Sequence, residues 1–431
     1  ILMKHMTETL KGHAAAPSLF LPENEEGAGM ILTTTDGQKG LPRYFSNVFA
    51  MSQGMNNGRV DFVLPDGRRF RAHGKNPGPV AEINIHNDDL FARLIREGDL
   101  GFCDGYLEGW WSTPDLQAFM DLVHADNEDI YDGFPGMGIV RLFERVRFWL
   151  QRNHKNQARK NISYHYDLGN DFYKLWLDDT MTYSSAIFQT GQESHEAAQI
   201  AKYASMVDQM GAQPGDHILE IGCGWGGFAE YAAKERGLKV TGLTISEEQI
   251  NYARKRIEKA GLSGMVDFKL QDYRDEKGIY DGIASIEMFE AVGEQYWPIY
   301  FETVRERLKP GKNATLQIIT VADRRWDVYK RGPDFIQKYI FPGGMLPSPS
   351  VLRAQIEKSG LGIVRSLEFG KSYSLSLRRW HETFNEKWDQ IAALGFDQRF
   401  RRMWNFYLTS CAATFESANC DVTQITISRP T

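Results

Sequence analysis

A glycine-rich turn that follows an acidic residue is the part of the sequence best suited to ligand chemistry. Glu220 lies two residues before Gly222. Two further glycines, Gly224 and Gly226, follow at alternate positions, and an apolar run precedes the glycines. Glycine allows the backbone to turn sharply and to approach a ligand closely, because it carries no Cβ atom. The segment therefore predicts a strand, a ligand-binding turn and a helix in succession. The alternative interpretation is a tight turn with a structural role alone.

The spacing of the glycines distinguishes between two nucleotide cofactors. Dinucleotide-binding proteins use the pattern G-x-G-x-x-G and place an acidic residue at the end of the second strand to bind a ribose. In this chain hydroxyl and amide side chains occupy that region, although Glu247 and Glu248 lie close by. Alternating glycines preceded by an acid are instead typical of class I methyltransferases, in which the acid helps to hold the methionyl amino group of S-adenosylmethionine. The residues expected to bind this cofactor are Glu220, Gly222, Gly224, Thr244 and Gln249, with Asp272 and Tyr273 at the adenine position.

Alternating strands and helices must position these residues, and such a pattern runs from about residue 195 to the end of the sequence. It predicts a doubly wound, Rossmann-like α/β sheet of the class I methyltransferase type with right-handed connections. The last strand follows two long helices and is expected to be antiparallel. The expected strands are His217–Ile221, Lys239–Leu243, Val266–Leu270, Gly282–Ile286, Ala314–Thr320, Ile363–Phe369 and Val422–Ser428.

A smaller α+β domain is predicted before this sheet. Two short segments, Val60–Leu64 and Arg69–His73, flank a Pro-Asp-Gly turn and are expected to form a hairpin, and Ala81–Ile85 alternates as a further strand. Helical periodicity follows at Leu90–Glu97 and Leu116–His124. The expected division is a loose leader (1–40), an N-terminal α+β domain (41–135), a basic amphipathic linker helix (136–165) and a methyltransferase domain (166–431).

The linker segment interleaves basic and aromatic residues, a composition typical of a helix that lies at a membrane interface. The alternative is a linker helix whose apolar side packs on the next domain, and the two interpretations are compatible. The basic residues are Arg141, Arg145, Arg147, Arg152, Lys155, Arg159 and Lys160.

The overall composition limits the classes of function. The formal net charge of −6 provides no overall attraction to nucleic acid or anionic lipid, so no nucleic-acid partner is expected and any membrane affinity must be local. The 4 cysteines have no regular spacing, which argues against a disulfide framework or a metal site and fits a reducing compartment. No run of about 18 apolar residues occurs, so a cytoplasmic protein without a membrane span is expected.

Several motifs, in the same order along the chain, resemble those of the cyclopropane fatty acid synthases, a family that includes the mycolic acid methyltransferases. The resemblance covers roughly residues 60–431 and implies that the N-terminal domain is lipid-associated. The matching segments are Gly98–Phe102, Glu108–Trp111, His165–Tyr173, Met181–Ser185, Glu220–Gly227, Gly242–Ser246, Gln271–Arg274, Met288–Gly293 and Tyr339–Gly344.

The resemblance implies electrophilic alkylation of a cis double bond. The alkene attacks the sulfonium methyl group, a carbocation forms on the acyl chain, and loss of a proton from the added methyl closes a cyclopropane ring. In relatives the base is a bound bicarbonate, held by side chains that include a Cys, a Glu, a His and a Tyr. The resemblance places this Glu at Glu290 and the Tyr at Tyr373, and it places Tyr183 and Ser184 near the methionyl end of the cofactor. His165, Tyr166 and Asp167 match a signature that closes over the site.

Two departures from the family pattern concern the bicarbonate site. The family's Cys is Ser185 here, and the His position holds Ile319 or Gln317, depending on which end of the strand is aligned. Neither Ile319 nor Gln317 can replace an imidazole as a titrating partner. A serine still offers a hydroxyl and a backbone amide, so bicarbonate binding stays open. The product is then a cyclopropane, or a methylene or methyl-branched chain formed after a hydride shift.

The expected substrate is the unsaturated acyl chain of a membrane phospholipid, reached by an enzyme peripherally associated with the inner face of the membrane. Two alternatives are a C-methyltransferase that acts on a non-phospholipid substrate and a paralogue that binds lipid or cofactor without turnover. Retention of the glycine motif together with Glu290 argues against the second alternative. The sequence leaves the oligomeric state open, with a homodimer among the alternatives.

Overall fold

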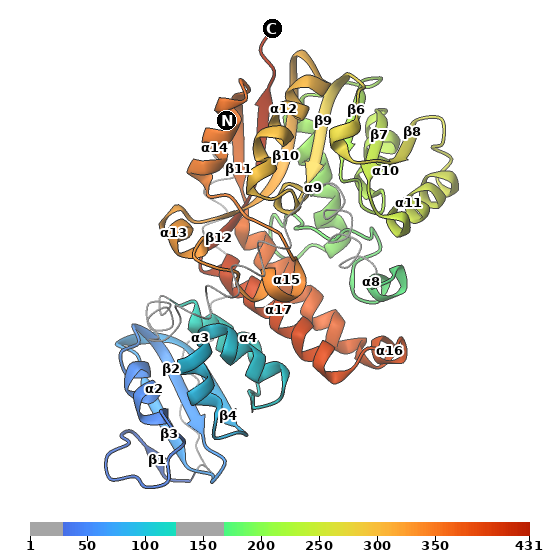
Figure 1. Ribbon diagram of the computed structural model, residues 1–431. Coiled ribbons are helices and arrows are strands. Elements are labelled where there is room, and N and C mark those ends of the chain that lie inside the picture. The colour runs from blue at the N-terminus through green and yellow to red at the C-terminus, as the bar shows by residue number, and fades with distance from the viewer. Residues whose placement is uncertain (1–28, 126–167) are drawn as a thin grey trace. The chain divides into compact units, whose positions relative to one another are not determined.

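The computed structural model describes residues 29–125 and 168–431, which form two compact units (Figure 1). The first unit contains the described residues up to 125 together with Gly395–Ser417, and the second contains those from 168 to Leu394 together with Ala418–Thr431. Three expected features lie outside the described residues: most of the leader, the basic segment 136–165, and the signature His165-Tyr166-Asp167.

The first unit is built on a five-stranded sheet with the strand order β1-β3-β2-β4-β5. The predicted hairpin is confirmed, because β2 and β3 pair antiparallel from Arg59 opposite His73 to Val63 opposite Arg69, and β4 runs parallel to β2. The strands are β1 (Ile31–Leu32), β2 (Asn57–Val63), β3 (Arg69–His73), β4 (Asn76–Ile85) and β5 (Trp111–Ser112). The helices are α2 (Phe45–Ser52), α3 (Leu90–Leu107), α4 (Leu116–Val123) and α17 (Gln398–Glu416).

The core of this unit is a cluster of phenylalanine rings, with centroids 4.9–6.4 Å apart. Each buried phenylalanine stabilises the fold by about 1.5–3 kcal/mol through removal of its apolar surface from water. The rings come from α2, from two strands and from α3, so they hold the helices on the sheet. They are Phe45, Phe49, Phe62, Phe70 and Phe91.

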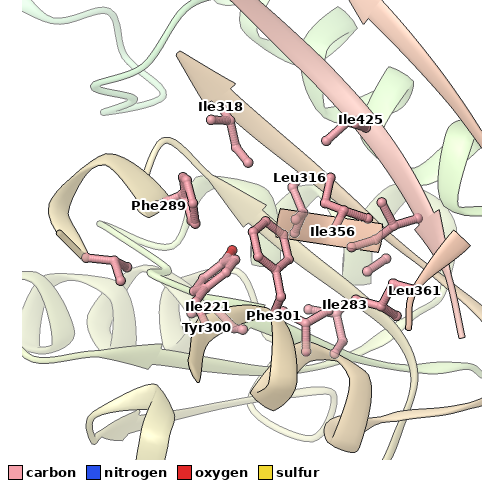
Figure 2. Packing of buried hydrophobic residues seen from close by; sticks show 14 of the residues in the cluster. Ile221, Ile283, Phe289, Tyr300, Phe301, Leu316, Ile318, Ile356, Leu361 and Ile425 are labelled. Atoms are coloured by element: carbon pink, nitrogen blue, oxygen red, sulfur yellow. The ribbon is translucent and has the colours of Figure 1, made fainter. Parts of the chain in front are cut away.

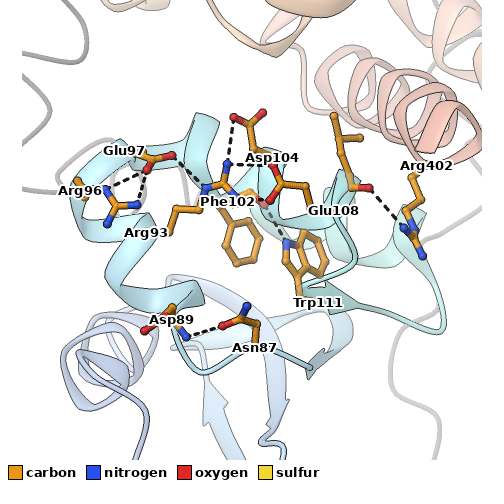
Figure 3. Close-up of polar contacts among 11 residues, drawn as sticks. Asn87, Asp89, Arg93, Arg96, Glu97, Phe102, Asp104, Glu108, Trp111 and Arg402 are labelled. Atoms are coloured by element: carbon orange, nitrogen blue, oxygen red, sulfur yellow. Dashed lines mark hydrogen bonds and ion pairs between the residues drawn. The ribbon is translucent and has the colours of Figure 1, made fainter. Parts of the chain in front are cut away.

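Helix α3 is longer than its periodicity indicated. The sequence predicts that the helix ends at Glu97, but it continues to Leu107 after a kink at Gly98. Gly98 has a φ of 71°, a conformation that glycine adopts without steric strain. Arg93 stabilises the two segments across the kink, because its guanidinium contacts Glu97, Asp104 and Glu108 at 3.0, 3.5 and 2.7 Å (Figure 3).

The domain division expected for the C-terminal region differs from the structure. The sequence assigns all of 166–431 to the methyltransferase domain, whereas α17 packs on α4 and α3 of the first unit. Gln117 donates to the Thr409 carbonyl at 3.1 Å. Arg402, which Figure 3 labels, donates to the Leu107 carbonyl at 3.4 Å. An amphipathic pattern shows that a helix has a buried face, but it does not show which domain covers that face.

The second unit confirms the predicted doubly wound sheet. Its strand order is β11-β12-β10-β9-β6-β7-β8, with β10, β9, β6, β7 and β8 mutually parallel and β12 antiparallel to both of its neighbours. The last strand is therefore antiparallel as expected, and it lies between β10 and the edge strand β11. The strands are β6 (His217–Ile221), β7 (Lys239–Thr244), β8 (Val266–Leu270), β9 (Tyr280–Ile286), β10 (Leu308–Val321), β11 (Gly362–Glu368) and β12 (Cys420–Ser428).

Helices cover both faces of this sheet. One apolar cluster contains Ile221 and Ile283 of the sheet, Tyr300 and Phe301 of α12, and Ile356 of α14 (Figure 2). A second cluster joins the sheet to α9, α10 and α11. The helices are α8 (Asn170–Trp176), α9 (His195–Met210), α10 (Gly227–Arg236), α11 (Glu247–Lys259), α12 (Trp297–Arg307), α13 (Trp326–Tyr329), α14 (Pro349–Lys358), α15 (Gly370–Glu386) and α16 (Trp388–Ala393). Among the described residues, none of the helices is long and apolar enough to cross a membrane.

The first unit contains a buried ion pair whose loss should be costly. Asp61 accepts hydrogen bonds from Arg71 at 2.8 Å, and both side chains are buried. Burial would raise the pKa of Asp61, but the hydrogen bond and charge of Arg71, with the charge of Arg59 and a hydrogen bond from Arg69, hold it below its ordinary value. The pair therefore contributes stability above the pKa of an unfolded aspartate, and this contribution is lost as the pH falls through the lower folded pKa.

We expect Asp61→Ala to lower the free energy of unfolding at neutral pH by about 3 kcal/mol, because the buried Arg71 guanidinium would lose the carboxylate that balances its charge. Denaturant unfolding measures the change, and the difference from the wild type should shrink below pH ~4. Asp66→Ala is the matched control, because Asp66 pairs with Arg68 at the surface and should contribute almost nothing. Equal destabilisation by the two variants would contradict the ion-pair assignment.

Candidate active site

The glycine turn lies where β6 ends and α10 begins, at the carboxyl end of the parallel strands. Gly222, Gly224 and Gly226 have φ values of 80°, 52° and 85°, a region that other residues rarely adopt. The amides of Gly222 and Cys223 donate to the Leu243 carbonyl at 3.0 and 2.8 Å, which anchors the turn on β7. A Cβ at Gly222 would lie 2.7 Å from Met288 Cγ, whereas one at Gly224 would meet no described atom within 4 Å. The backbone at Gly224 is thus open to a ligand.

Glu220 gives the turn an acidic partner for a cationic ligand group. Its side chain is 2% exposed, and Oε2 has no hydrogen-bond partner among the described residues. Burial raises the pKa of Glu220 well above its ordinary value, against the charges of Lys202 and Arg256. A buried acceptor of this kind is costly unless a ligand or partner satisfies it. The open turn and the unsatisfied acid therefore fit S-adenosylmethionine, and a contact of Glu220 with its amino group stays a prediction.

The second strand carries hydroxyl and amide groups at its end. The Thr244 hydroxyl donates to Gln249 Oε1 at 2.8 Å and accepts from the Ser246 amide at 3.1 Å, and all three side chains are buried. Glu247 and Glu248 are exposed in the first turn of α11. The acids that a dinucleotide site would require are thus on the surface, and the residues predicted for the methyltransferase cofactor face inward.

Asp272 and Tyr273 follow β8, beyond the same edge of the sheet. Both carboxylate oxygens of Asp272 accept from Arg274, at 2.8 and 2.6 Å. The Tyr273 ring lies 5.5 Å from the Tyr300 ring in the core, and its hydroxyl has no hydrogen-bond partner within the described ranges. The structure brings the two residues to the expected edge, and their contact with adenine stays a prediction.

Tyr183 lies in a group of aromatic rings. Its ring centroid is 5.5 Å from those of Tyr173 and Trp176 and 5.6 Å from that of Trp380. Tyr173, Trp176 and Trp380 are almost completely buried. Aromatic faces attract cations, and densely packed rings exclude water. This group of rings is suited to a site in which positive charge develops on carbon or sulfur.

Lys202 places a buried positive charge beside the predicted site residues. Its ammonium group donates to the Ser184 hydroxyl at 2.6 Å, and its side chain is fully buried on α9. Burial lowers the pKa of Lys202 to about 7, against the negative charges of Glu287, Asp178 and Glu220. Lys202 was not among the residues predicted from the sequence, because a lysine within a helical pattern is usually exposed.

Glu287 is the second residue that the sequence analysis did not select. It directly follows β9, and its backbone has a φ of 49°, an uncommon conformation for a residue with a side chain. Ser185 donates its amide to Glu287 Oε1 at 2.8 Å, and Gln317 donates its side-chain amide to the same oxygen at 2.8 Å. Tyr373 donates its hydroxyl to Oε2 at 2.5 Å. We name Glu287 and these three donors the carboxylate cradle.

The contacts within the cradle show which residue of β10 lies beside the acids and how Ser185 is oriented. Gln317 pairs with Ile286 of β9, so its side chain reaches Glu287, whereas Ile319 offers its backbone amide to Glu290 at 2.5 Å. Gln317 therefore takes the position beside the acids that the alignment had left open between the two residues. Ser185 contributes its amide, but its hydroxyl donates to the Ala186 carbonyl at 2.9 Å and does not point at the acids.

Glu290 lies on the next turn after Glu287. Its Oε1 accepts from the Ile319 amide, and its buried Oε2 has no hydrogen-bond partner in the described part of the chain. Burial, together with the charge of Glu287, raises the pKa of Glu290 to about 8. Two acids thus share this space, and Glu290 is the one that is neutral at pH 7. Within the described residues, no group of His, Cys, Asp and Glu side chains is arranged to hold a metal ion.

The open turn leads to a prediction about cofactor binding. We expect Gly224→Ala to weaken binding of S-adenosylmethionine by at least about tenfold, because the added methyl would occupy the space open to the ligand. Isothermal titration calorimetry measures the change. Gly211→Ala is the matched control, since Gly211 also has a positive φ, of 72°, and open space at its Cβ position but ends α9. Equal losses in both variants would indicate that backbone strain, and not ligand contact, is responsible.

The raised pKa of Glu290 leads to a prediction about stability. The folded protein keeps this carboxyl protonated up to about pH 8, whereas the unfolded chain releases the proton near its ordinary value of 4.5, so stability is lost as the pH rises between these values. Glu290→Gln removes this dependence. The variant should therefore gain in Tm relative to the wild type as the pH increases from 5 to ~8. A Tm difference that does not change with pH would show that Glu290 titrates normally in the folded protein.

Comparisons with known proteins agree with this geometry. The sequence profile described as mycolic acid cyclopropane synthetase matches residues 153–425. The chain is 37% identical to the tuberculostearic acid methyltransferase UfaA1 of Mycobacterium tuberculosis, over 80% of this chain and 82% of the relative. It is 35% identical to the cyclopropane-fatty-acyl-phospholipid synthase of Escherichia coli K12, over 82% of this chain and 89% of the relative.

Solved structures show the same relationship. The mycolic acid cyclopropane synthase CmaA1, complexed with SAH and CTAB, superposes with a TM-score of 0.60 at 29% identity, over 64% of this chain and 98% of that chain. The cyclopropane synthase MmaA2 of Mycobacterium tuberculosis gives a TM-score of 0.59 at 31% identity, over 62% of this chain and 97% of that chain. Since the profile, the relatives and the cofactor turn agree, this chain belongs to the mycolic acid cyclopropane synthetase family and is an S-adenosylmethionine-dependent methyltransferase.

Proposed function

We propose that this enzyme alkylates the cis double bond of unsaturated acyl chains in membrane phospholipids. Two relatives support a lipid substrate through their names, a cyclopropane-fatty-acyl-phospholipid synthase and a tuberculostearic acid methyltransferase. Access to such a substrate requires contact with a bilayer, and the basic, aromatic composition of segment 136–165 supports peripheral association with the inner face of the membrane.

One observation carries the proposal: two acids and a group of aromatic rings lie together next to the cofactor turn. Tyr373 connects them, because its hydroxyl bonds Glu287 at 2.5 Å and its ring lies 6.4 Å from the Trp380 ring. Met288, one residue after Glu287, contacts the turn at Gly222. Negative charge and aromatic faces stabilise a carbocation, and a carboxylate can accept its proton.

Each group of residues has a separate role in the proposed reaction. S-adenosylmethionine supplies an electrophilic methyl group when bound. The glycine turn and Glu220 hold and orient this cofactor, and the rings around Tyr183 keep water away from the reacting chain. The Glu287 carboxylate beside Tyr373 balances the positive charge that develops on the alkylated acyl chain. Glu290, Tyr373 and Ser185, the catalytic residues expected from the sequence, are retained in this proposal as neighbours of that carboxylate.

The altered bicarbonate site favours a second product for the same methyl transfer. Gln317 and the amide of Ser185 stand where relatives use a histidine and a cysteine, so the base differs in kind and position. A hydride shift before proton loss would then give a methylene chain in place of a ring. A C-methyltransferase with a non-phospholipid substrate remains the alternative for the substrate class.

Expression in a bacterial host that lacks its own synthase tests the proposal. We expect mass spectrometry of the extracted phospholipids to show monounsaturated acyl chains that have gained one methylene unit. Fragmentation then separates a ring from a methylene or a methyl branch. Cells that express Gly224→Ala are the control for dependence on the cofactor turn. Unchanged phospholipids in cells with soluble, cofactor-binding protein would refute the phospholipid substrate.

A further inference from the structure

The carboxylate cradle uses the positions where the family resemblance places bicarbonate ligands. Three of those positions, Ser185, Gln317 and Tyr373, all direct hydrogen-bond donors at the Glu287 carboxylate. The fourth, Glu290, lies three residues further along the chain. A bicarbonate and a glutamate side chain both present a planar carboxylate-type group, so one set of donors can bind either but not both together.

The donor protons of the cradle are fully used. The single proton of the Ser185 amide and that of the Tyr373 hydroxyl go to Glu287. The Gln317 amide nitrogen has two protons, one directed at Glu287 and one at the Ser185 carbonyl at 3.3 Å. The Ser185 hydroxyl donates to Ala186. These three residues therefore have no donor left for an external anion, and the site does not fit bicarbonate.

The orientation of the Gln317 amide is determined by a further contact. Its Oε1 accepts from Gln424 Nε2 at 3.1 Å, which directs its own nitrogen toward Glu287. Gln424 is oriented in turn, because its Oε1 accepts from Ser205 at 2.6 Å and from Gln209 at 2.7 Å. The donor to Glu287 is thus set by a hydrogen-bond network that extends from β12 to α9.

The backbone conformation of Glu287 also supports a functional role for its carboxylate. Its φ of 49° is a conformation that glycine adopts freely and that a residue with a Cβ adopts at a cost. Such strain persists at functional sites when the surroundings impose it. Glycine would relieve the strain at this position, so the side chain is present for its carboxylate and not for the turn.

We propose that Glu287 replaces bicarbonate as the base of this enzyme, an inference that depends on the proposed function. The proton lost from the alkylated acyl chain passes to a Glu287 carboxylate oxygen. The electron pair of the broken C–H bond closes either the ring or the double bond of a methylene group. Three hydrogen bonds leave one acceptor position of the carboxylate for this proton, which then returns to solvent.

Bicarbonate dependence of the purified enzyme tests the inference. The assay uses vesicles of a phospholipid with cis-monounsaturated chains, in buffer freed of carbon dioxide, with and without added sodium bicarbonate. We expect the wild-type rate to be equal in both buffers. Glu287→Gly should lose about 10²–10⁴-fold in rate and recover at least about tenfold when bicarbonate is added, because the anion can then enter the emptied cradle.

Two further variants control for structure. Glu287→Gln keeps the shape of the side chain, so it should lose the rate without loss of S-adenosylmethionine binding and without bicarbonate rescue. Ala418→Gly also introduces glycine at a positive φ, of 58°, in the same unit, and should leave the rate unchanged. Thermal unfolding of Glu287→Gly should show a cooperative transition, so that its loss of rate is not a loss of the fold.

A binding measurement separates this inference from the proposed function. Calorimetric titration with bicarbonate should show binding to Glu287→Gly and none to the wild type, whatever the lipid substrate is. Wild-type binding of bicarbonate, or a wild-type rate that falls more than about tenfold without it, would overturn the role of Glu287. If the wild type methylates none of the phospholipids tested, the proposed substrate is wrong. The bicarbonate titration then still tests the role of Glu287.

Discussion

The buried ammonium group of Lys202 is the charge on which the arrangement of this site depends. Three acids, Asp178, Glu220 and Glu287, act on it from separate segments of the chain, and each would be costly to bury without a positive neighbour. Through its hydrogen bond to Ser184, the same group holds the loop that carries Ser185 into the cradle. The cofactor acid, the loop and the cradle thus share one buried basic group as a neighbour.

The parallel sheet explains why these groups meet. Parallel strands end at a common edge, and open α/β sheets bind ligands beyond it. The glycine turn after β6, Thr244 at the end of β7 and Glu287 after β9 all lie there. Uncommon backbone conformations occur at the same edge, at the turn glycines and at Glu287. A regular sheet supports local strain where a ligand must approach closely.

Much of the second unit could be predicted from the sequence, because its signals are local. The alternation of strand and helix patterns marked all seven strands of the sheet, and the ends of β6 and β8 agree with the structure. Alternating glycines identified the cofactor turn, since the requirement for a positive φ is written in the residue type. The partner of α17 was not predictable in this way, because the helix packs on a unit distant in sequence.

By itself, the sequence determined the cofactor turn, the class of fold and the family, since each depends on residue types at short spacing. Only the tertiary structure decided the carboxylate cradle, because three donors from a loop, from β10 and from α15 converge on Glu287 after the end of β9. Their separations from Glu287 along the chain are 102, 30 and 86 residues. The sequence Glu-Met-Phe-Glu does not distinguish Glu287 from Glu290. Burial raises the pKa of both carboxyls. Hydrogen-bond donors converge on Glu287 and oppose this rise, whereas the charge of Glu287 adds to it at Glu290.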